Sequence, residues 1–147
     1  MTVTHIVVAT DGSPNGQTAV EWAGELADQT QARVTVVHVF EPLAHLAGSG
    51  PVDLARLRDE AADELAGVWS QPLAERGIAF DTAVVEGKPA DAIADTATQR
   101  DADLVVVGAR GLSPLRRVVL GSTSQRLPHV CSAVSYTHLT LPTNACV

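Results

Sequence analysis

Positive charge is scarce in this sequence. Lys88 is the only lysine among 147 residues, and the formal net charge is −7. Proteins that bind nucleic acid or an anionic membrane surface need a basic patch, so the composition argues against both partners. No apolar run approaches membrane-spanning length, and the chain begins with a strand pattern rather than a secretion signal. We therefore expect a cytoplasmic protein whose partner is a small molecule or another protein.

Aromatic residues and cysteines are also few. Aromatic residues account for 3% of the chain and hydrophobic residues for 46%, so the core must be aliphatic. Such a composition is typical of helices packed on a parallel sheet, and the length is that of one domain. Cys131 and Cys146 have neither a metal-ligand spacing nor the spacing of a redox pair. We expect both cysteines to be structural or incidental.

The histidines do not form a pattern that indicates chemistry. They lack the spacing of metal ligands, and none is paired with an evident nucleophile. We expect each of them to be structural or exposed, namely His5, His38, His45, His129 and His138.

Hydrophobic periodicity predicts strands that alternate with helices. The expected strands are residues 3–9, 33–40, 79–86 and 104–107, and the expected helices follow Ser13 and cover residues 54–68, 89–99 and 122–130. Ser13 is the predicted N-cap of the first helix, with Pro14 at its first position. Pro72 is expected to kink or end the second helix. This alternation predicts a parallel sheet with right-handed crossovers and helices on both faces.

A glycine pattern follows the fourth predicted strand. It begins with Gly108 and Gly111 and, after nine further residues, continues with Gly121 and Ser122. Glycine permits positive φ and close backbone approach, and a helix that starts beyond it offers free N–H groups to a phosphate. The pattern matches neither the P-loop nor the dinucleotide fingerprint. The residues alone leave two interpretations open: a triphosphate-binding loop, or a glycine-rich loop that opens a helix with Ser122 as its N-cap.

The spacing Gly-x2-Gly-x9-Gly-Ser/Thr resembles the nucleotide motif of ATP-binding universal stress proteins, and every fixed position is filled here. The chain is similar to that family from His5 through His38 and Val39 to about Val134. The resemblance implies an α/β fold, a three-layer open twisted parallel sheet with strand order 3-2-1-4-5, which is a Rossmann-like adenine-nucleotide-binding fold. In such sheets ligands bind beyond the carboxyl ends of the strands where the order reverses, here between strands one and four.

The resemblance also implies which residues bind the nucleotide, ATP with or without Mg²⁺. Asp11, with Thr10 before it, would contact the ribose or the base, although Asp-Gly-Ser is also ordinary turn chemistry. The backbone of Val39 would contact adenine, although a strand valine is otherwise a core residue. The phosphates would be bound by Gly108, Gly111, Gly121, Ser122 and Thr123, with Ser122 or Thr123 near the metal ion.

Three arginines lie in or beside the glycine pattern: Arg110, Arg116 and Arg117. Guanidinium groups suit phosphate oxygens, although arginine clusters of this size also occur as solvated surface. Arg110 is the best placed of the three, and we assign it to the predicted site.

The end of the chain departs from the family pattern. We expect a universal stress protein domain over residues 1–134 and an atypical tail over residues 135–147, where the family has an unbroken aliphatic strand. The alternating residues of the tail are compatible with an edge strand that Pro142 ends; otherwise the tail is not native sequence. In many family members the last strand pairs two subunits. The resemblance thus implies a homodimer, which the altered strand puts in doubt.

The leading hypothesis is a cytosolic universal stress protein that binds ATP in a crevice at the ends of strands one and four. It would act as a nucleotide-responsive regulatory module in the stress response. One alternative is a slow ATP hydrolase, although no residue is evident as a general base, since Asp11 would be engaged by the nucleotide. Another is a dimerising stress protein that binds no nucleotide.

Overall fold

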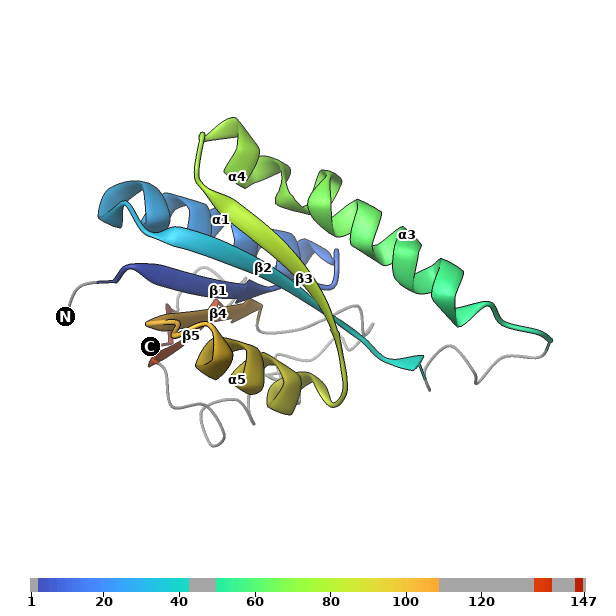
Figure 1. Cartoon of the computed structure of the whole chain (residues 1–147). Helices are drawn as coiled ribbons and strands as arrows, with labels where there is room; N and C mark the ends of the chain where they lie inside the picture. The colour runs from blue at the N-terminus through green and yellow to red at the C-terminus, as the bar shows by residue number, and fades with distance from the viewer. Residues whose placement is uncertain (1–2, 43–49, 109–133, 139–144, 147) are drawn as a thin grey trace.

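A sheet forms the centre of the fold (Figure 1). The computed structural model describes residues 3–42, 50–108, 134–138 and 145–146. The strands are β1 (His5–Ala9), β2 (Arg33–Phe40), β3 (Phe80–Glu86), β4 (Leu104–Gly108), β5 (Val134–His138) and β6 (Ala145–Cys146). Their order is β3-β2-β1-β4-β5-β6, and each neighbouring pair is parallel except β5 with β6. The predicted order 3-2-1-4 is confirmed, and the backbone of β5 lies beside β4 as the fifth strand.

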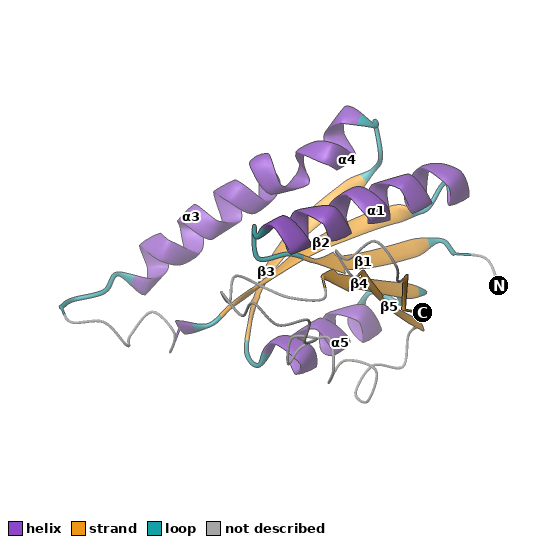
Figure 2. Cartoon of the chain, turned by 180° about the vertical axis from the view of Figure 1, so that it is seen from behind, coloured by secondary structure: helices purple, strands orange, loops and turns teal. Residues whose placement is uncertain are grey.

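Helices cover both faces of the sheet. The helices α1 (Pro14–Thr30), α3 (Leu54–Ala66) and α4 (Gln71–Glu75) lie on one face, and α5 (Pro89–Gln99) lies on the other (Figure 1, Figure 2). The predicted three-layer α/β architecture is therefore confirmed. The helix predicted over residues 122–130 lies outside the described residues. Among the described helices, none has the length and apolar character needed to cross a membrane.

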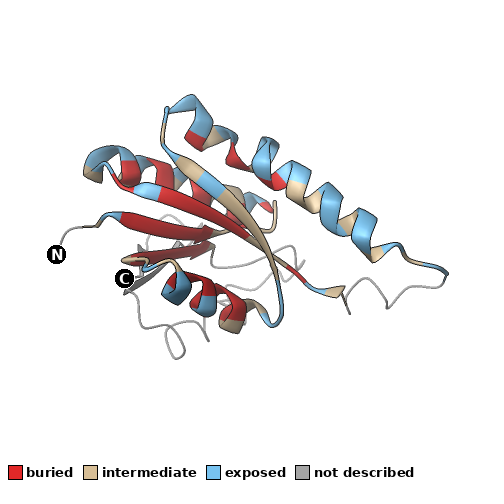
Figure 3. Cartoon of the chain, in the orientation of Figure 1, coloured by how far each residue is buried: buried red, intermediate tan, exposed pale blue. Residues whose placement is uncertain are grey.

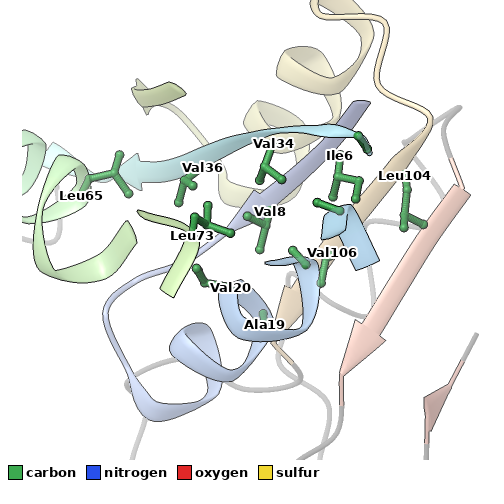
Figure 4. Packing of buried hydrophobic residues seen from close by; sticks show 13 residues of the cluster. Ile6, Val8, Ala19, Val20, Val34, Val36, Leu65, Leu73, Leu104 and Val106 are labelled. Atoms are coloured by element: carbon green, nitrogen blue, oxygen red, sulfur yellow. The ribbon is translucent and has the colours of Figure 1, made fainter. Parts of the chain in front are cut away.

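Both faces of the central strands are buried, as the red ribbon of β1 and β2 shows (Figure 3). Ile6 and Val8 pack in one core cluster with α1, whereas Val7 packs in the other with α5, because successive strand side chains point to opposite faces. Leu65 of α3 and Leu73 of α4 complete the first cluster (Figure 4). This burial explains the nearly continuous aliphatic runs of the sequence, since a covered parallel sheet has no solvated face.

The second predicted helix ends earlier than its periodicity indicates. The helix α3 stops at Ala66, a 3₁₀ turn η1 (Val68–Ser70) follows, and Pro72 lies in the first turn of α4. A break at Pro72 is therefore wrong, because proline is tolerated in a first turn, where the missing N–H has no helical partner. The break comes at Gly67, whose φ of −103° and ψ of −99° are not helical. Val68, predicted to continue the apolar face, is 67% exposed.

The strand β5 spans the predicted boundary after residue 134, and the tail contributes the rest of β5 and all of β6 to the sheet. The strand β5 begins at Val134 and ends at His138, four residues before Pro142. It pairs in parallel with β4 and in antiparallel orientation with β6. The predicted edge position is therefore wrong for this strand, because β6 occupies the outer side.

Candidate functional site

The carboxyl end of β1 leads into α1 through a tight turn. Thr10 is 5% exposed, and its Oγ1 accepts a hydrogen bond from the Gly12 N–H at 3.1 Å. The Asp11 carboxylate accepts one from the Ser13 N–H at 3.0 Å, and Ser13 Oγ accepts one from the Gly16 N–H at 3.1 Å. The predicted N-cap is thus confirmed. The turn holds the half-buried Asp11 side chain beside a helix N-terminus, where the helix dipole is positive.

Gly16 lets the first turn of α1 approach the end of β1 closely. A Cβ at this position would lie 2.5 Å from Thr10 Oγ1 and 2.9 Å from Asp11 Oδ1. Any larger side chain would therefore displace the two polar groups that form the turn. The sequence gives no indication of this role, since a lone helical glycine is not a signal by itself.

The first glycine of the predicted phosphate motif lies beside this turn. Ala9 pairs with Val107, so the residues that follow, Thr10 and Gly108, lie side by side at the carboxyl ends of β1 and β4. A Cβ on Gly108 would lie only 2.9 Å from the carbonyl oxygen of Asn15 in α1. Packing against the helix therefore already requires glycine here, independently of any ligand.

The structure brings together some of the predicted site residues and leaves others undescribed. Thr10, Asp11 and Gly108 meet at the carboxyl ends of β1 and β4. Val39 lies in β2, two residues beyond the residue that pairs with Ala9, and packs with the core cluster on the α5 face. The remaining predicted residues lie outside the described part of the chain: Arg110, Gly111, Gly121, Ser122 and Thr123.

Three further residues, which the sequence did not assign to the site, contact the same turn. The Nδ1 of His38 lies 3.0 Å from the Thr10 carbonyl oxygen, to which it donates a hydrogen bond. Its ring meets the Trp69 ring edge to face, with centroids 5.2 Å apart. Gln17 Oε1 accepts from Thr10 Oγ1 at 3.3 Å. Strand alternation could have indicated that His38 faces the α1 side of the sheet, as Val36 does. No sequence pattern near Trp69 indicates that it lies beside this turn.

Residues 2–133 match the sequence profile of the Universal stress protein family. The chain belongs to the universal stress protein family. A relative from Thermus aquaticus, named "Universal stress protein in QAH/OAS sulfhydrylase 3'region", is 35% identical over 124 residues, which are 83% of this chain and 88% of the relative. The universal stress protein MJ0531 of Methanocaldococcus jannaschii is 32% identical over 126 residues, 83% of this chain and 74% of that protein.

Solved structures share the fold of this universal stress protein. A universal stress protein in complex with cAMP has a TM-score of 0.73 and 24% identity, with 96% of this chain and 100% of that chain covered. The hypothetical protein MJ0577 has a TM-score of 0.80 and 16% identity over 97% and 100% of the two chains. The universal stress protein of Archaeoglobus fulgidus in complex with dAMP has a TM-score of 0.69 and 22% identity over 93% and 98%. Identities this low establish the fold alone.

Four arginines in the described part of this universal stress protein are paired with carboxylates. Arg56 pairs with Glu60, Arg58 with Glu86, and Arg76 with both Glu25 and Asp28. The fourth arginine, Arg100, pairs with Asp81. The carboxylate partners lie on α1, α3 and β3, so each of these four guanidinium groups already has an acidic partner.

The opposite, amino end of the sheet holds a polar network around His5, which is 4% exposed. The ring nitrogens of His5 lie 2.9 Å from the Arg100 carbonyl oxygen and 2.7 Å from Thr35 Oγ1. Thr35 in turn donates to Asp81 at 2.8 Å. Burial raises the pKa of the Asp81 carboxyl, but hydrogen bonds from Thr35 and Arg100 and the Arg100 charge outweigh it and hold that pKa below its ordinary value of 3.8. His5 takes the structural role that the sequence predicts.

We expect this network to make stability depend on pH at the acid end. Because the pKa of Asp81 is lowered on folding, its ionised form stabilises the native state above pH 3.8, and that stabilisation is lost as the pH falls through the lowered native pKa. The side chain is 55% exposed, so the effect should stay below about 1 kcal/mol. Urea denaturation should show a larger difference between wild type and Asp81→Asn at pH 6 than at pH 3. Equal differences at both pH values would contradict the assignment.

Proposed function

We propose that this universal stress protein binds an adenine nucleotide, and ATP in particular, at the carboxyl ends of β1 and β4. The observation that carries the proposal is the position of Gly108, the first residue of the glycine motif, beside the Thr10–Asp11 turn. From Gly108 the chain continues through every fixed position of the motif. The related structures solved with cAMP and dAMP support an adenine nucleotide as the class of ligand.

The proposed contacts divide the nucleotide between two strand ends. The Asp11 carboxylate would accept hydrogen bonds from the ribose or the base, and the Val39 backbone would contact adenine. Backbone N–H groups and hydroxyls after β4, together with Arg110, would bind the phosphates, whose charge the N-terminus of α1 also favours. A Mg²⁺ ion would be held mainly by phosphate and water oxygens near Ser122 or Thr123.

In this proposal the bound nucleotide controls what the protein associates with. Phosphate binding would hold the segment after β4 in one arrangement and so bias association with partners, including a second copy of the chain. We propose this regulatory role for a cytoplasmic protein of the stress response, in which the nucleotide is a signal rather than a substrate.

Calorimetric titration of the full chain, tail included, with Mg-ATP tests the proposal. We expect micromolar affinity for ATP and much weaker binding of GTP, which has the same phosphates on a different base. Titrations with AMP and cAMP then measure what the β- and γ-phosphates contribute. Absence of ATP binding by a folded protein would overturn the proposal and favour the nucleotide-free dimer, which sedimentation would detect.

The same samples test slow ATP hydrolysis. Release of ADP in proportion to protein concentration, and its loss in Gly111→Val, would identify an enzyme. ATP that stays intact over many hours in saturated protein would identify a binding module.

A further inference from the structure

Trp69 connects a segment that is distant in sequence to the candidate nucleotide site. It belongs to η1, between α3 and α4, and is partly buried against the core cluster on the α1 face. Its indole lies directly against Gly12 in the turn after β1. A Cβ on Gly12 would be 2.5 Å from the indole carbons Cε2 and Cζ2 and 2.8 Å from Nε1. The indole therefore occupies the space in which a side chain at Gly12 would stand.

Two routes of contact join Trp69 to Thr10. On one route, the Trp69 ring meets the His38 ring at an interplanar angle of 67°, and His38 donates to the Thr10 carbonyl. On the other, the Gln17 amide donates to the Trp69 carbonyl at 3.4 Å and accepts from Thr10 Oγ1. Ring and backbone of Trp69 are thus both linked to the residue that precedes Asp11.

The turn itself needs such support. Gly12 has a φ of +78°, in the left-handed region that glycine enters easily and also leaves easily. A change of conformation at Gly12 would move the Ser13 N–H, which donates to the Asp11 carboxylate and so fixes its orientation. Ordering such a segment when a ligand binds reduces the affinity, whereas a turn that is already ordered avoids this cost.

We propose that Trp69 is a positioning residue of the nucleotide site. It covers Gly12 and contacts Thr10 through His38 and Gln17, and it thereby holds the turn that contains Asp11 in its binding conformation. The inference rests on the proposed function, because it concerns how the same site is kept ready for an adenine nucleotide. It also makes η1 sensitive to occupancy, since a ligand on Asp11 stabilises the turn against which the indole packs.

The first test compares two substitutions at Trp69 with a matched control. Trp69→Leu, which loses the flat ring, should weaken ATP binding in calorimetry at least tenfold, and Trp69→Phe should restore most of the affinity. Trp22→Leu is the control. Trp22 packs against the same core cluster but lies about two and a half turns of α1 beyond Ser13. Trp22→Leu should have a lower free energy of unfolding in urea denaturation, as Trp69→Leu does, but it should keep the wild-type affinity for ATP.

The second test uses fluorescence, because the chain has only two tryptophans. In Trp22→Phe the emission comes from Trp69 alone and should change during ATP titration, with the dissociation constant found by calorimetry. In Trp69→Phe the emission comes from Trp22 and should stay constant.

The outcomes separate the two proposals. Wild-type ATP binding combined with unchanged affinity in folded Trp69→Leu would overturn the positioning role and leave the proposed function intact. Equal losses of affinity in Trp69→Leu and Trp22→Leu would also overturn it, since stability alone would then explain both. No ATP binding by the wild type would remove both proposals.

Discussion

Replacing Gly111 with valine is expected to abolish ATP binding. If the motif after β4 binds phosphate through its backbone, a branched side chain at its second glycine stands where a phosphate oxygen must approach. Calorimetry with Mg-ATP should show no heat of binding at protein concentrations that saturate the wild type. We expect the free energy of unfolding to stay within about 0.5 kcal/mol of the wild-type value.

Urea denaturation of the same sample supplies the control for this prediction. A folded Gly111→Val protein that binds ATP with wild-type affinity would remove the phosphate assignment from the motif. Ser122→Ala offers a milder comparison, because it removes one hydroxyl donor and leaves the backbone N–H groups in place. Its affinity should fall less than that of Gly111→Val.

Replacing Gly108 with valine is expected to act mainly on folding, lowering the free energy of unfolding by about 3 kcal/mol. A Cβ there would lie 2.9 Å from the carbonyl oxygen and 3.0 Å from the carbonyl carbon of Asn15. These are backbone atoms in the first turn of α1, so they cannot move aside without disturbing the end of β4 or the helix. Urea denaturation measures the loss. Unchanged stability would show that the strand and the helix can separate at low cost.

Gly77→Ala separates this steric cost from the cost of an unfavourable backbone conformation. Gly77 has a φ of +68° and open space where a Cβ would stand, so alanine there should cost only about 1 kcal/mol. The stability of Gly108→Val also limits what its ATP binding can show. A loss of ATP binding in Gly108→Val cannot by itself be assigned to phosphate contact, whereas a loss of binding in a fully stable Gly111→Val can.

Much of the fold could be predicted from local patterns. The valine-rich runs that became β1, β2 and β4 are recognisable because a parallel sheet covered on both faces needs aliphatic residues at every position. Ser13 could be recognised as an N-cap because capping depends on groups within three residues of it. The prediction for Pro72 was wrong because a proline can either break a helix in its interior or lie in the first turn of a new helix. The chain already leaves the helix at Gly67, so Pro72 lies in the first turn of α4.

The candidate site was predictable in part. Asp11 and Gly108 could be brought together because parallel strands one and four end at the same edge of the sheet. The motif alone could not show that Gly108 is also required by the approach of Asn15. His38 has a structural role, as predicted, but its contact with Thr10 could not be predicted, because nothing in the sequence shows which residue its ring faces.

The sequence by itself determined the class of fold and the family, through periodicity, capping and short motifs, which involve residues close together in the chain. The strand ends at which a ligand is expected follow from the resemblance to that family, which implies the order of the strands. Only the tertiary structure decided that Trp69 covers Gly12, that η1 is joined to the turn after β1 and that Gly108 touches α1. The physical reason is distance along the chain: the hydrogen bond from Gln17 to Trp69 spans 52 residues, and it exists only because α1, α3 and α4 pack on the same face of one sheet.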